Sequence, residues 1–110
     1  MSEEEIKILL LKQSRLSTWD LADITTDTTL DNTYQVLLCD CTSGDITLTL
    51  PAAADNVGLM YHVKKTDSSA NIVTVDGNAS ETIDGATTQT ITSQYDSIKI
   101  ISDGTNWGIL

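Results

Sequence analysis

From Tyr34 onward, the sequence divides into short β-favouring segments with turn-forming residues about every ten positions. In residues 46–50, Ile46, Leu48 and Leu50 alternate with threonines, which is the pattern of a strand with one buried face. The other predicted strands are residues 34–40, 59–65, 72–76, 87–92, 97–102 and 107–110. This spacing predicts an all-β domain, which we expect to be an antiparallel β-sandwich or jelly-roll-like fold of about 7–8 strands.

The segments between these strands are rich in residues that form tight turns. Asp-Gly pairs are the strongest short hairpin signal, and they recur along this half of the chain. We expect turns at Asp76-Gly77-Asn78, Asp84-Gly85 and Asp103-Gly104. The carboxylates at these turns, with those of Asp45 and Asp67, are predicted to accept local backbone hydrogen bonds rather than to take part in catalysis.

Residues 1–33 differ in character and are interpreted as an N-terminal arm and linker for docking or oligomerisation, followed by a domain over residues 34–110. The apolar arm (residues 6–11) supports two interpretations. Ser2 and Glu5 fit a helical capping box, whereas the alternation in residues 6–11 fits a strand or an arm that becomes a strand on a partner. Residues 14–31 are predicted to be an irregular linker. The candidate partner-binding residues are Ile6, Ile8, Leu9, Leu10, Leu11 and Trp19.

The charge balance argues against two classes of partner. Sixteen acidic and six basic residues give a formal net charge of -10. A chain this acidic is repelled by a phosphate backbone and lacks the basic amphipathic face that binds anionic membranes. We therefore expect no nucleic-acid and no membrane partner. The beginning of the chain has no secretory signal pattern.

The sequence offers little for catalysis. His62 is the single histidine, and none of the familiar nucleophile, phosphate-binding or zinc motifs is present. Cys39 and Cys41 are too close along a strand for a favourable disulfide and are predicted to be small core side chains. Trp107 is predicted to be a core or interface residue. We therefore expect no enzymatic activity, no catalytic or metal-binding residue and no cofactor; a glycan-acting carboxylate pair is the less favoured alternative.

Several segments occur in the same order as in a known β-rich module. They are residues 50–54 (LPAAA), 63–71 (VKKTDSSAN), 73–75 (VTV), 81–85 (ETIDG), 95–97 (YDS) and 102–107 (SDGTNW). Over residues 34–110 the chain resembles a module of tailed-bacteriophage virion proteins, often found near the C-terminus of tail fibres and related appendages. Residues 8–19 loosely resemble the opening arm of such proteins, with Gln13-Ser14 where those usually have Arg-Gly.

This resemblance implies a virion structural protein, commonly a homo-oligomer, made in the host cytoplasm and located on the capsid surface or an appendage. For a chain of this size we expect a capsid decoration (cement) protein that binds the major capsid protein or another virion protein through its arm. The alternative is a short tail-fibre or head-fibre knob that binds a host receptor through loops, with Asp76 and Asn78 as possible contacts. Dimer and trimer both remain open.

Overall fold

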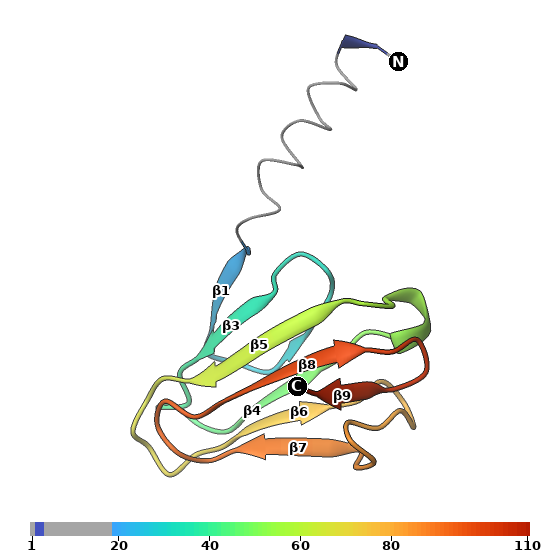
Figure 1. Cartoon of the computed structure of the whole chain (residues 1–110). Coiled ribbons are helices and arrows are strands. Elements are labelled where there is room, and N and C mark those ends of the chain that lie inside the picture. Colours follow the sequence, from blue (N-terminus) through green and yellow to red (C-terminus); the bar gives the residue numbers. More distant parts are fainter. Residues whose placement is uncertain (1, 4–18) are drawn as a thin grey trace.

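The computed structural model describes residues 2–3 and 19–110. The described part is an all-β domain (Figure 1). Its strands are β1 (Leu21–Ile24), β2 (Thr28–Thr29), β3 (Val36–Cys39), β4 (Ile46–Thr49), β5 (Met60–Lys65), β6 (Val73–Asp76), β7 (Thr88–Ile91), β8 (Ser97–Ser102) and β9 (Trp107–Ile109). One short 3-10 helix, η1 (Ala53–Asp55), lies between β4 and β5.

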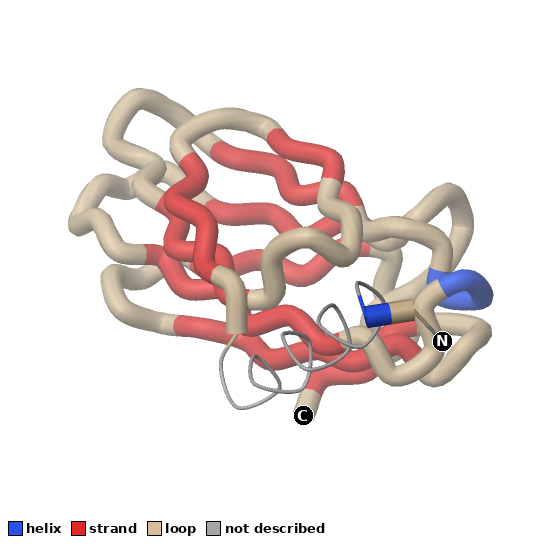
Figure 2. Tube along the Cα trace, turned by 90° about the horizontal axis from the view of Figure 1, so that it is seen from above, coloured by secondary structure: helices blue, strands red, loops and turns tan. Residues whose placement is uncertain are grey.

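The strands form two sheets that enclose one core, and Figure 2 shows them as two layers. The five-stranded sheet has the order β1-β3-β5-β8-β9, and the four-stranded sheet has the order β2-β4-β6-β7. From β1 to β6 the chain therefore enters the two sheets alternately, so that each strand pairs with the strand two places earlier. This winding makes β1, β3 and β5 parallel in one sheet and β2, β4 and β6 parallel in the other.

The all-β class is confirmed, but the expected antiparallel pairing is wrong for this half of the domain. Four strand pairs are parallel, and only β5–β8, β6–β7 and β8–β9 are antiparallel in the described part. The short Thr42–Asp45 turn would suit a hairpin, yet it carries the chain from β3 in one sheet to β4 in the other. Parallel neighbours require such a crossover, which is supplied here by the opposite sheet rather than by a helix.

The core lies between the sheets and consists of the alternate residues expected to point inward. Leu48 is completely buried, as the alternation predicted, and so are Tyr61, Val63 and Val75. Threonines occupy most outward positions of the four-stranded sheet, which accounts for the high threonine content because β-branched polar residues suit a solvated strand face. Cys39 and Cys41 are buried free thiols and Trp107 is 2% exposed, so these predictions are confirmed.

Two strands lie where the sequence indicated an irregular linker. β1 and β2 both fall within residues 14–31. Their local signal is weak, since β1 reads LADI and β2 consists of two threonines. Parallel pairing supplies what the local pattern lacks: β1 aligns with β3 from Leu21↔Val36 to Ile24↔Cys39, and β2 aligns with β4. The β-domain therefore begins before residue 34.

The connection between β6 and β7 covers residues 77–87, close to the gap between the predicted strands 72–76 and 87–92. Asp76-Gly77-Asn78 does not form a tight hairpin; residues 77–87 form a loop, and Gly77 donates its amide proton to the carbonyl of Thr87 at 3.0 Å. A Cβ at position 77 would lie 2.3 Å from the Glu81 carbonyl oxygen, so the loop needs glycine for this close approach. The Glu81 carboxylate in turn accepts the amide proton of Ala53 at 3.0 Å, which ties the loop to η1.

Two predicted tight turns are confirmed. Ile83 and Ala86 exchange backbone hydrogen bonds across Asp84-Gly85, where both φ angles are positive. This is the geometry for which Asp-Gly is favoured. Asp103-Gly104 lies in the β8–β9 hairpin, and the Asp103 carboxylate accepts amide protons from Thr105 and Asn106 at 2.8 Å each.

Candidate interaction surface

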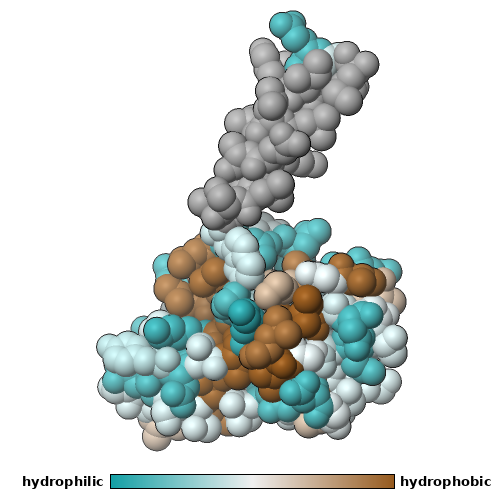
Figure 3. Space-filling model, in the orientation of Figure 1, coloured by the Kyte–Doolittle hydropathy of each residue, from teal (hydrophilic) through white to brown (hydrophobic). Residues whose placement is uncertain are grey.

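The outward side of the five-stranded sheet carries large apolar side chains on adjacent strands, and we call it the sheet face. In β3 and β5, and at Lys99 and Ile101 of β8, the residues opposite the buried set are half-buried rather than fully solvated. Figure 3 shows a hydrophobic area on the side of β5 and β8 that faces the viewer. The sheet face consists of Leu21, Asp23, Val36, Leu38, Met60, His62, Lys64, Lys99 and Ile101. Parallel strands are usually covered on both sides, so an apolar outward side marks a contact surface.

Trp19 packs on this face next to the start of β1. Its ring lies edge-on to the His62 ring, with 4.5 Å between the ring centroids, and the Trp19 side chain is 42% exposed. Burial and the nearby charge of Lys99 lower the pKa of His62 below its usual value, so the imidazole is neutral at pH 7. Among the predicted partner-binding residues, Trp19 is the one that the structure describes; Ile6, Ile8, Leu9, Leu10 and Leu11 lie outside the described residues.

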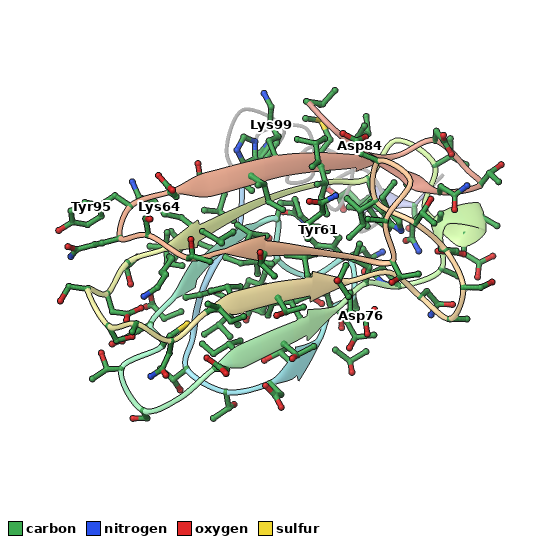
Figure 4. All side chains as sticks on the ribbon, turned by 90° about the horizontal axis from the view of Figure 1, so that it is seen from below. Tyr61, Lys64, Asp76, Asp84, Tyr95 and Lys99 are labelled. Atoms are coloured by element: carbon green, nitrogen blue, oxygen red, sulfur yellow. The ribbon has the colours of Figure 1, made fainter. Side chains whose placement is uncertain are left out.

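The two lysines of the described domain that are not fully buried both lie on the sheet face. Within residues 19–110 the basic side chains are Lys64, Lys65 and Lys99, and Lys65 is completely buried. Lys64 lies over the ring of Tyr95, with 5.4 Å from its ammonium nitrogen to the ring centroid. Figure 4 shows Lys64 beside Tyr95 at one end of the domain and Lys99 projecting away from the other sheet. An acidic chain thus presents one face that is both apolar and basic.

Lys65 takes part in a buried polar cluster at the end of β5. Its ammonium group lies 2.7 Å from a carboxylate oxygen of Asp67 and donates to the backbone carbonyls of Asp67 and Ser69, each at 3.1 Å. The other Asp67 carboxylate oxygen accepts the amide proton of Cys41 at 2.7 Å, and Asn71 donates to the Cys41 carbonyl. The cluster therefore joins the segment after β3 to the β5–β6 turn.

The same cluster contains a lysine and a serine hydroxyl, the residue types of a Ser–Lys nucleophile pair. The Ser69 hydroxyl oxygen lies 3.5 Å from the Lys65 nitrogen and donates a short hydrogen bond to Asp67. The ammonium group is paired with the Asp67 carboxylate and donates to two backbone carbonyls, so its hydrogen bonds are committed to these structural partners. The arrangement acts as a structural lock rather than as an activated nucleophile.

The hydrogen bonds to the Asp67 carboxylate make stability depend on pH. Burial alone would raise its pKa, but hydrogen bonds from Lys65, Ser69 and the backbone amide of Cys41 outweigh it and hold the pKa well below its usual value. A carboxyl group whose pKa is lower in the folded state stabilises the fold above its unfolded pKa and loses this contribution as the pH falls toward the folded pKa. We expect the urea midpoint to fall steeply below about pH 4, where unfolded aspartate begins to protonate. A urea midpoint that is constant through this acid range would contradict this prediction.

The domain is open at the side of β1 and β2. A groove of about 520 Å³ lies there, lined by both strands and by the segments that follow them, including Leu30, Thr33 and Tyr34. The lining of the groove includes the apolar side chains of Ile24 and Leu37 and the acidic side chains of Asp23 and Asp31. β1 and β2 are the terminal strands of their sheets in the described part, so a further strand has access to their main-chain groups.

Asp76 and Asn78, the predicted loop contacts, are half-buried, and their backbone carbonyls accept hydrogen bonds within the domain. Asp76 ends β6 and is half-buried, and its carbonyl accepts the amide proton of Leu50 at 2.8 Å. Asn78 is half-buried, and its carbonyl accepts the amide proton of Glu81 at 2.9 Å. Their side chains belong to one end of the four-stranded sheet, where Figure 4 shows Asp76. Both residues are remote in topology from the sheet face, which belongs to the other sheet.

Residues 2–3 and 19–110 contain no group of three or more His, Cys, Asp or Glu side chains arranged to hold a metal ion. Burial, followed by the nearby thiol of Cys41, raises the pKa of the Cys39 thiol to about 12, which keeps it protonated. A search of the described residues finds no helix long and apolar enough to cross a membrane.

No protein-family model matches the sequence, and no curated protein matches it significantly.

Sequence reasoning found the alternation that creates the sheet face but assigned it no role. The signal was present in β3, which reads VLLC and is apolar on both sides, and in β5, where Met60, His62 and Lys64 share one side. A strand that is apolar on both sides predicts cover on both sides. The contribution of β1 could not be found in this way, because residues 14–31 were interpreted as linker.

Proposed function

We propose that this protein is a bacteriophage virion structural protein, most specifically a capsid decoration protein that binds the capsid surface through its N-terminal arm. The observation that carries the proposal is the place where the arm joins the domain. The chain enters at β1, a terminal strand of the five-stranded sheet, beside the open groove between β1 and β2. An arm attached there can add main-chain hydrogen bonds to a partner while the domain stays outside.

The sequence resemblance and the domain's architecture support the same proposal. Two small facing sheets with tight turns make a compact outer module, as the expected sandwich would, although the parallel pairing gives no support to a jelly-roll topology. The polar groups that resemble a catalytic pair form a structural lock. On a symmetric capsid, repeated weak contacts add up, so a small arm is sufficient for stable decoration.

The test is co-sedimentation with capsids that lack the protein. We expect the full chain to bind saturably and a chain starting at Ser14 to lose binding, because it lacks the apolar arm (residues 6–11). The matched control carries Asp76→Ala and Asn78→Ala, which alter the loop and leave the arm intact, and it should bind like the full chain. Saturable binding by the chain starting at Ser14 would contradict attachment through the arm.

The alternative, a receptor-binding fibre knob, predicts a different pattern. The specific observation in its favour is the 77–87 loop, which is longer than a hairpin turn and has two non-glycine residues with positive φ, Ala79 and Asp84. A knob should adsorb to host cells as a free protein and should lose adsorption with Asp76→Ala and Asn78→Ala. Adsorption to cells without any capsid binding would replace decoration with this function.

A further inference from the structure

The sheet face carries charges of opposite sign on either side of an apolar centre. In the parallel registers, Asp23 on β1, Leu38 on β3 and Lys64 on β5 form one row across the sheet. The next row is Leu21, Val36 and His62, in the same strand order. Each row thus has an apolar residue of β3 at its centre, and the first row has a negative and a positive end at equal spacing from that centre.

We propose that the sheet face is the interface for a second copy of this chain. The two copies are related by a two-fold axis that lies between their sheet faces, over β3 and parallel to it. Rotation about such an axis turns one sheet face onto the other and exchanges the positions of β1 and β5. Asp23 of each copy then lies opposite Lys64 of its partner, which gives two symmetry-related ion pairs. The strands of the two faces remain aligned, as in ordinary packing of one sheet on another.

The apolar residues also match in this arrangement. Leu38 lies opposite its own counterpart, and so does Val36. Leu21, which is 50% exposed, lies opposite the His62 ring and the Trp19 ring packed beside it. The most exposed aliphatic side chain of β1 therefore meets an aromatic pair, and the half-buried side chains of β3 lose their remaining contact with water.

A second copy suits this face better than a nucleic acid or a lipid surface does. The face holds the two half-buried lysines of the described domain, yet the chain as a whole has a net charge of -10 and repels anionic polymers and membranes. Two such acidic chains can associate where opposite charges meet. The Asp23–Leu38–Lys64 row provides these opposite charges. Contact through only three short strands of each copy predicts a weak dimer rather than a permanent one.

The experiment measures mass in solution by light scattering and sedimentation over a range of protein concentrations. The wild-type chain is expected to approach twice its mass of 11.9 kDa at high concentration. Asp23→Lys alone, or Lys64→Asp alone, places like charges together at both contacts and is expected to weaken association by at least ~10-fold. The chain carrying both substitutions restores opposite charges and should recover association.

Lys99→Asp is the matched control. It makes the same change in charge on the same face, but β8 lies beyond the strands that overlap, so association should stay near wild type. Circular dichroism and thermal unfolding show whether each variant folds. If Lys64→Asp proves unstable, Asp23→Lys still tests the ion pairs, because Asp23 is exposed. A monomer at all concentrations, a trimer, or a doubly substituted chain that fails to recover would overturn the proposal.

This inference rests on the proposed function and deepens it, since the sequence resemblance behind that function implies a homo-oligomer, but each can fail alone. The chain starting at Ser14 retains the whole sheet face while it lacks the apolar arm. We therefore expect it to dimerise without binding capsids. A capsid-binding monomer would refute the dimer and leave decoration intact, whereas a dimer that ignores capsids would do the reverse.

Discussion

Replacing Asp67 with asparagine is expected to destabilise the domain by about 3–5 kcal/mol, because Lys65 would keep a buried charge without its partner. Lys65 is completely buried and the Asp67 side chain is 7% exposed, so water cannot take the place of the lost carboxylate. The substitution also weakens the hydrogen bond from the Cys41 amide to the side chain at position 67. This hydrogen bond holds the segment after β3 in place. Urea unfolding at neutral pH measures the loss directly.

A double substitution separates the cost of the unpaired charge from the cost of the altered turn. With Lys65→Met added to Asp67→Asn, no charge remains in the cluster, and the free energy of unfolding should return close to that of the wild type. The double variant should also lose less stability than the wild type as the pH is lowered. If Asp67→Asn alone unfolds at the same urea concentration as the wild type, the ion pair contributes nothing to the fold.

Replacing Trp107 with alanine is the second large expected effect, again about 3–5 kcal/mol of lost stability. The side chain is 2% exposed, and its ring lies 5.7 Å from that of Tyr61 between the two sheets. Its backbone also joins β9 to the loop before β7, donating to the Thr82 carbonyl and accepting from the amide of Asp84. Removal of the indole leaves a cavity where these elements meet.

Trp107→Phe is expected to cost less than alanine for a specific reason. The indole nitrogen of Trp107 has no hydrogen-bond partner among the described residues, so phenylalanine sacrifices volume but no hydrogen bond. Leu110→Ala is the matched control, since that side chain is 64% exposed and adjoins the same strand. Thermal unfolding compares the three variants. If Trp107→Ala is as stable as Leu110→Ala, the indole is not a core contact.

The sequence predicts the strands well because their signal is local. β4 and β8 lie within the predicted segments, and the alternation in β5 places Tyr61 and Val63 on one face, which the structure shows to be the inward one. Pairing is different, because it depends on residues far apart in the chain. The turn between β3 and β4 has the composition of a hairpin, and nothing local shows that the next strand joins the other sheet.

The candidate surface was predictable only in part, for the same reason. Trp19 stands out as an aromatic residue in a polar segment, but its contact with His62 joins positions that no local pattern connects. The row of Asp23, Leu38 and Lys64 requires the parallel register of three strands. Lys65 shows the limit most clearly: the alternation placed it on one face with Tyr61 and Val63 but did not show that this face is buried, and its partner Asp67 was interpreted as a turn residue.

Cryo-electron microscopy of capsids saturated with the purified protein would test the proposed decoration role most directly. We expect added density of the size of this domain at equivalent positions over the capsid surface, joined to the shell by a thin connection at the β1 side of the domain. Capsids mixed with the chain starting at Ser14 should lack this density. Density restricted to the tail, or no added density with the full chain, would contradict a decoration protein attached by its arm.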